Sequence, residues 1–174
     1  MYGKSSWGGP VDPFILTTFE KTAADDDSDA IVSLVIFEYE DERHIGKLPT
    51  PDAEHPEVIC NEEAVEGKLC NDTEIGQFII NAEKDEKSKH TIVTKAIHLK
   101  DAEPIKYPVK RTGYYCVGTF GYSADDYKGV VEFRNAYGEL PAAQIAKLPF
   151  FGGLTIVYAV IGTCVFSNAI VYLS

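Results

Sequence analysis

Cysteine and histidine side chains are the first candidates for chemistry in this sequence of 174 residues. No C-x-x-C pair occurs, and the histidines do not follow the short spacings of zinc ligands. We therefore expect no metal site and no cofactor, and structural roles for the cysteines. The residues concerned are Cys60, Cys70, Cys116, Cys164, His44, His55, His90 and His98.

The spacing of the cysteines suggests one structural disulfide. Cys116 lies in the strand-like run Gly113 to Tyr122, where a sheet would hold it. Cys60 opens a segment with helical spacing that needs a tether to that sheet. We therefore predict a Cys60–Cys116 disulfide, which would stabilise the domain by about 4 kcal/mol through loop closure. Cys70 would then pair outside this chain or remain a thiol, and Cys70–Cys116 is the alternative bond.

The tripeptide Asn71-Asp72-Thr73 matches the acceptor sequence for N-linked glycosylation. It follows Cys70 in a polar stretch that we expect to be an exposed turn. We predict an N-linked glycan on Asn71. A disulfide, a sequon and a membrane helix in one chain favour an oxidising, luminal compartment.

Motifs for enzymatic chemistry are not found in the sequence. It contains no G-x-S-x-G, no glycine-rich phosphate loop and no H-E-x-x-H. The acidic run from Asp25 to Asp29 lacks the spacing of a calcium loop and is expected to be a solvated turn. A formal net charge of −11 argues against nucleic acid as a partner. We expect a protein that acts by binding and is not an enzyme.

Short strands separated by turn residues account for most of the chain. The strongest is Ile31 to Tyr39, which is rich in β-branched and aromatic residues. A short helix is expected between Glu62 and Ile80. This pattern predicts a mainly β fold, an antiparallel β-sandwich over residues 1–139. The other expected strands are 14–19, 91–99, 105–109, 113–122 and 128–135.

The C-terminal segment has the composition of a membrane-spanning helix. No charged residue occurs from Leu148 to Ser174, and 148–173 is long enough to cross a hydrocarbon core of about 30 Å. We predict one transmembrane helix in contact with lipid, preceded by a juxtamembrane linker at 140–147. Small residues at Gly152, Gly153, Ala159 and Thr163 suit packing against further helices, although glycine is also common in membrane helices, and both interpretations stand.

Several stretches of the chain resemble the fungal branch of the lung seven-transmembrane receptor-like family. They include MYGKSSWGGPVDPF, VSLVIFEYEDE, EEAVEGKLC, TKAIHLKD, IKYPVKRTGYYCV, VVEFRNAYGELPA and LPFFGGLTIVYAVIG. The resemblance covers nearly the whole chain up to about Gly162. Its most specific part is the junction between FRNAYGELPA and LPFFGGLTIVYA.

The resemblance implies a luminal GOLD-like β-sandwich followed by the first of seven helices, in a Golgi or endosomal membrane. It also implies a signal peptide before MYGK and six helices after the first, so we expect an N-terminal fragment. The expected function is protein trafficking through a luminal partner or cargo protein. The alternative is a ligand-sensing cap on a seven-helix receptor or channel-like protein.

Overall fold

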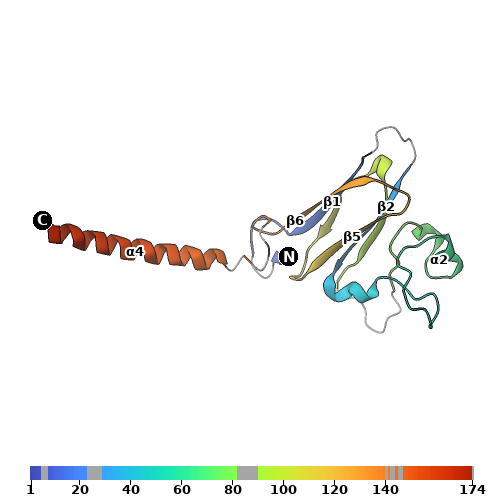
Figure 1. Cartoon of the computed structure of the whole chain (residues 1–174), viewed down its shortest axis with the longest axis horizontal. Helices are drawn as coiled ribbons and strands as arrows, with labels where there is room; N and C mark the ends of the chain where they lie inside the picture. The colour runs from blue at the N-terminus through green and yellow to red at the C-terminus, as the bar shows by residue number, and fades with distance from the viewer. Residues whose placement is uncertain are drawn as a thin grey trace.

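Six strands form the core of the domain in the computed structural model, which describes residues 1–4, 8–22, 29–81, 90–139, 141, 144 and 147–173, with side chains described up to 165 (Figure 1). They form two antiparallel sheets of three strands, in the orders β4-β1-β6 and β3-β2-β5. The predicted mainly β fold and antiparallel sandwich are confirmed. The strands are β1 (Phe14–Lys21), β2 (Ile31–Glu38), β3 (Val93–His98), β4 (Ile105–Pro108), β5 (Tyr115–Gly121) and β6 (Tyr127–Arg134).

The core lies between the two sheets. Ile15 and Phe19 of β1 point inward and pack in one buried cluster with Leu34 and Ile36 of β2. Residues two apart on a strand share a face, so the alternating burial of β1 follows directly from its sequence. The outer face of β1 carries polar or half-buried residues. We call β4-β1-β6 the bare sheet.

The outer face of β2 is also buried. Val35, which points away from the sandwich core, is 2% exposed. A covering segment (residues 39–81) lies over this face, and α2 (Glu62–Glu66) sits on the side of β2 away from the bare sheet (Figure 1). The backbone N–H of Phe78 donates to Oγ1 of Thr94 on β3 at 2.8 Å, which joins the segment to the sheet. We call β3-β2-β5 the covered sheet.

The covering segment has little regular structure but many backbone contacts. Besides α2 it contains the 3-10 turns η1 (Tyr39–His44) and η2 (Asp72–Glu74), and η3 (Leu99–Asp101) follows β3. Isolated antiparallel bridges join Ile45 to Ile80, Lys47 to Glu57 and Ile59 to Phe78. These bridges pair the backbone groups that a loop lying on a sheet would otherwise bury without partners.

The disulfide joins Cys60 to Cys70, with Cα atoms 6.0 Å apart. The prediction of a Cys60–Cys116 bond is therefore wrong. Cys116 is a half-buried thiol on β5 and is in no disulfide. The reason is that hydrogen bonds such as Phe78 N–H to Thr94 already tether the covering segment to the sheet. The disulfide instead closes a ten-residue loop around α2, whose buried Ala64 packs with Cys60.

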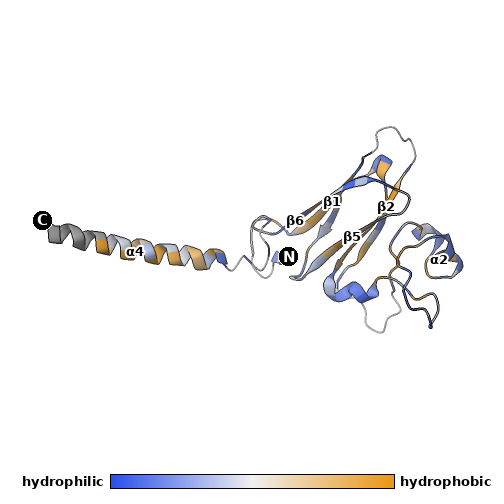
Figure 2. Cartoon of the chain, in the orientation of Figure 1, coloured by the Kyte–Doolittle hydropathy of each residue, from blue (hydrophilic) through white to orange (hydrophobic). Residues whose placement is uncertain are grey.

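The last element is the apolar helix α4 (Lys147–Leu173), which extends away from the sandwich (Figure 1). Its described length is coloured almost throughout as hydrophobic or neutral (Figure 2). The stretch Lys147–Val165 contains an 18-residue window with a mean hydropathy of 1.9, and its residues are exposed. It is long and apolar enough to cross a bilayer. Residues 25–28 of the acidic run and most of the expected linker at 140–147 lie outside the described residues.

Candidate functional site

Two buried carboxylates converge where β2 ends. Glu38 is the last residue of β2 and Asp41 lies in η1, one turn later. Glu38 is 4% exposed and Asp41 is 1% exposed. The Glu38 carboxylate accepts the backbone N–H of Glu40 at 2.8 Å and so caps the start of η1. This capping bond fixes the position of the turn that carries Asp41.

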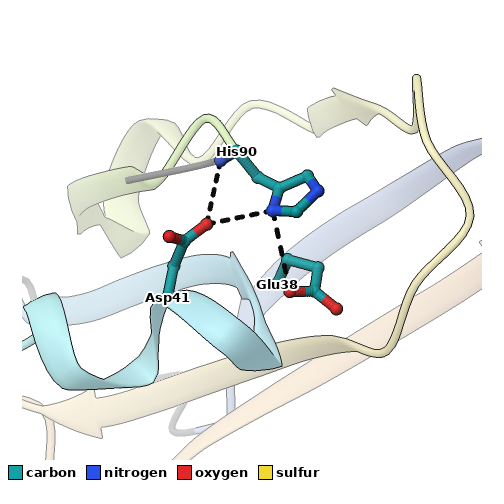
Figure 3. A group of neighbouring side chains, drawn as sticks. All are labelled: Glu38, Asp41 and His90. Carbon is teal, nitrogen blue, oxygen red and sulfur yellow. Dashed lines mark hydrogen bonds and ion pairs between the residues drawn. The ribbon is translucent and has the colours of Figure 1, made fainter. Parts of the chain in front are cut away.

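His90 completes the group from a distant part of the chain (Figure 3). Its backbone N–H donates to Oδ2 of Asp41 at 2.9 Å, and its ring Nδ1 lies 3.1 Å from the same oxygen. Nδ1 also lies 3.6 Å from Oε2 of Glu38. One ligand atom from each of the three residues lies within 4.8 Å of the others. Two carboxylates and an imidazole in this arrangement can hold a proton or a metal ion.

Gly113 gives the Glu38 carboxylate the space it occupies. A Cβ at Gly113 would lie 2.7 Å from Oε1 of Glu38, closer than the two atoms can approach. Without that Cβ, Oε1 accepts the backbone N–H of Tyr114 at 3.0 Å. Two backbone N–H groups therefore hold the Glu38 carboxylate, one directly after β2 and one directly before β5. These bonds fix the orientation of the carboxylate.

A pocket of about 550 Å³ opens beside the cluster and is lined by His90, Tyr107, Arg111 and Tyr115 among others. Burial, together with the charges of Tyr115, Asp41 and Glu38, raises the pKa of Tyr107 to about 12. Burial and the Glu38 charge also raise the pKa of Tyr115. Both phenols therefore remain protonated at physiological pH. Their hydroxyls donate to the backbone carbonyls of Thr91 and Arg111.

A second candidate surface is the open edge, which we define as the outer strands β5 and β6, each with one edge that faces away from its sheet. In the described part of the chain, neither outer edge pairs with another strand. Val131 pairs with Thr17 and Phe133 pairs with Ile15, and paired residues share a face of the sheet. Both partners on β1 are buried, so Val131 and Phe133 lie on the inner face, yet each is 37% exposed. The inner face of β6 is therefore only partly covered by the rest of the domain.

Residues 1–135 match the family described as the PTM1-like N-terminal domain. The chain belongs to the PTM1-like family. It is 32% identical over 169 residues to "Membrane protein PTM1" of Saccharomyces cerevisiae, covering 92% of this chain and 32% of that protein. It is 31% identical over 163 residues to "Uncharacterized membrane protein C18A7.02c" of Schizosaccharomyces pombe, covering 92% of this chain and 34% of that protein.

The PTM1-like chain thus spans about a third of the length of these two relatives. The family match ends at residue 135, directly after β6, so it contains both sheets and the carboxylate–histidine cluster. No solved structure matches this chain. The names of the two relatives and the apolar α4 together indicate a membrane protein.

The predicted site residues of the PTM1-like domain do not gather in one place. Cys60 and Asn71 lie in the covering segment, where Asn71 is exposed and its Nδ2 donates to Glu74 at 3.2 Å. Cys116 lies on β5, and burial, with the charges of Glu42 and Glu38, raises the pKa of its thiol. A thiol of that kind is unreactive at neutral pH. Glycosylation of Asn71 remains a prediction.

No local pattern in the sequence indicated the Glu38–Asp41–His90 cluster. His90 lies 49 residues after Asp41, far outside any short ligand spacing. The two carboxylates resembled ordinary surface charges because EYEDE is a run of acidic residues after a strand. A usable signal was the position of Glu38, since a charged residue that continues a fully buried strand needs a partner.

Proposed function

We propose that this chain is the luminal recognition domain and first transmembrane helix of a multi-pass protein of the Golgi or endosomal membrane. It acts in protein trafficking by binding a luminal partner or cargo protein, and it has no catalytic role. The open edge is the observation that carries this proposal. The GOLD-like character and the kinship with lung seven-transmembrane receptor-like proteins are part of the same proposal.

The membrane part of the proposal rests on α4. Its exposed apolar surface suits lipid, and the matched relatives are about three times longer than this chain. Around Gly152 and Gly153 nothing lies within 4 Å of the position a Cβ would take, so a neighbouring helix could approach closely there. We expect the remaining helices of the full-length protein to pack on this side of α4.

The luminal orientation is supported by the Cys60–Cys70 disulfide and by the exposed sequon at Asn71. In microsomes, protease added outside should leave the β-domain intact, and alkaline carbonate should not extract the protein. Enzymatic deglycosylation should lower the mass of the wild type by the mass of a glycan, and it should leave the mass of Asn71→Gln unchanged. Digestion of the domain from outside would reverse the orientation, and carbonate release would contradict the membrane anchor.

Recognition at the open edge would use strand addition. An extended partner segment can pair with the free N–H and C=O groups of β6, while alternate side chains cover Val131 and Phe133. Tyr114, which is 80% exposed and directly precedes β5, supplies apolar contact area. A hydrogen bond of 3.0 Å from the Tyr127 hydroxyl to Oγ1 of Thr119 holds the two strands together at the other end of this edge.

Substitutions on opposite faces of β6 test this proposal in the full-length protein. Val131→Ser with Phe133→Ser removes the exposed inner-face groups, and Val130→Ser is the control on the outer face of the same strand. We expect the double variant to delay cargo transport in a pulse-chase experiment, with normal membrane insertion, and the control to behave as wild type. Normal transport by the double variant and by a variant lacking residues 13–135 would contradict the proposal.

The pocket supports a second candidate, a ligand-sensing cap. It has the volume of a small-molecule site and is lined by the aromatic rings of Tyr107 and Tyr115 and by the Arg111 side chain. A variant that blocks the pocket, such as Thr91→Trp, would distinguish the two functions. Loss of cargo transport with an intact open edge would favour the sensing cap, and unchanged transport would favour strand addition.

A further inference from the structure

The Glu38–Asp41–His90 cluster has the separations of a metal site. Zn²⁺ binds histidine nitrogen and carboxylate oxygen at about 2.0–2.2 Å, so tetrahedral ligand atoms are about 3.4 Å apart. The His90 Nδ1 atom lies 3.1 Å from Asp41 Oδ2 and 3.6 Å from Glu38 Oε2. These two distances lie on either side of the tetrahedral value. All three ligand atoms lie within 4.8 Å of one another, so changes of side-chain position can bring them around one ion.

The burial and the ligand types of the cluster also suit a metal ion. Glu38 and Asp41 are almost fully buried, and a carboxylate oxygen of each lies near the ring nitrogen of His90. Carboxylate oxygen and imidazole nitrogen are the ligands that divalent transition metals take together. The buried His44 lies on the other side of Asp41, with its Nδ1 3.7 Å from Asp41 Oδ1.

The backbone contacts of the cluster are compatible with metal binding. A carboxylate oxygen has two lone pairs, so Glu38 can accept the Glu40 N–H and also bind an ion, and Asp41 can do the same beside the His90 N–H. The pocket that His90 also lines gives an ion and a fourth ligand a route from solvent. The imidazole decides the class of metal, because Ca²⁺ and Mg²⁺ prefer oxygen ligands.

We propose that Glu38, Asp41 and His90 form a binding site for a divalent transition-metal ion of the zinc class, with a fourth position for water or a carboxylate from a ligand in the pocket. Nothing in the partner-binding proposal requires this site. The site would fix the end of β2, η1 and the segment before β3 relative to one another, since each of these three segments supplies one ligand.

Metal titration of the intact chain in detergent micelles tests the site. After removal of metal with a chelator, Zn²⁺ binding is followed by calorimetry and Co²⁺ binding by its visible absorption. We expect one ion per chain, tetrahedral Co²⁺ absorption and a higher Tm with Zn²⁺. His90→Gln removes the nitrogen ligand but keeps the backbone N–H bond to Asp41, and it should weaken binding at least ~100-fold.

His98→Gln is the matched control. His98 also pairs with a carboxylate, with its Nδ1 2.6 Å from Asp29 Oδ2, but this pair is exposed. The control should bind Zn²⁺ as the wild type does. Glu38→Gln and Asp41→Asn are second variants, which keep a side-chain oxygen to accept the backbone N–H groups, and each should also weaken binding. A folded wild type that binds neither ion at about 1 mM, or equal affinity in His90→Gln and wild type, would overturn the proposal.

Discussion

The covered and bare sheets have the same number of strands but differ in their outer faces. β2, at the centre of the covered sheet, is buried on both faces, while β1, at the centre of the bare sheet, alternates between core and solvent. The covering segment causes this difference. It carries the disulfide and Asp41 of the cluster, and it begins directly after Glu38, the last residue of β2. The bare sheet carries β6 of the open edge, and the other strand of that edge, β5, belongs to the covered sheet. The comparison teaches that the buried polar groups of this domain gather where the covering segment leaves its sheet.

Val35→Asp should have the largest effect on this comparison. Its side chain points into the interface between β2 and the covering segment and is 2% exposed. An unpaired charge there should lower the free energy of unfolding by at least ~3 kcal/mol. Val130→Asp, on the 53% exposed outer face of β6, should change it by less than about 1 kcal/mol. Equal effects in urea unfolding would show that the two outer faces are equally open.

Removing the disulfide should have the next largest effect. Cys60→Ser with Cys70→Ser opens a ten-residue loop, which should cost about 2.7 kcal/mol by the chain-entropy argument. Guanidinium unfolding with and without reductant measures it, and the variant should show no response to reductant. Cys116→Ser should keep the wild-type response. If Cys116→Ser instead lost the response, the pairing of Cys60 with Cys116 would be correct.

Tyr107 connects β4 to the segment before β3 and should have a smaller effect. Its hydroxyl donates to the Thr91 carbonyl at 2.7 Å, so Tyr107→Phe should cost about 1 kcal/mol at neutral pH. Mainly through burial, the pKa of Tyr107 is raised to about 12 from 10.0. Its stabilising contribution is therefore complete below pH 10 and is lost as pH rises through 12. Unfolding free energies from pH 9 to 12 should fall less steeply in Tyr107→Phe, and equal slopes would contradict this.

Asp29→Ala should have the smallest effect. Asp29 lies closer to His98 than Asp41 lies to His90, at 2.6 Å against 3.1 Å. Both members of the exposed pair are about half accessible, so water screens their attraction. The expected loss is below about 0.5 kcal/mol in thermal unfolding and should vanish in high salt. A larger loss would mean that distance, and not burial, decides the strength of these pairs.

The strands could be predicted because their signals are local. Alternation in β1 and the continuous apolar run of β2 are both visible in the sequence, and α4 is evident from the uncharged stretch after Lys147. The disulfide and the cluster depend on contacts between distant segments. Cys60 was assigned to Cys116 because a tether to the sheet was expected, but backbone bonds such as that of Phe78 to Thr94 supply it. The path of the covering segment therefore had to be known first.

The attachment of β6 to its neighbours has a mechanical consequence. Tension on the membrane anchor enters the domain after β6, where Asn135 accepts the backbone N–H of Tyr2 and the buried Tyr2 hydroxyl accepts that of Tyr137. Force along β6 loads its eight-residue ladder with β1 in shear, because antiparallel hydrogen bonds lie across the strand direction. All these bonds then share the load and do not break one at a time. A segment paired with the outer edge of β6 would likewise resist a pulling force along the strand, because its hydrogen bonds would be loaded in shear.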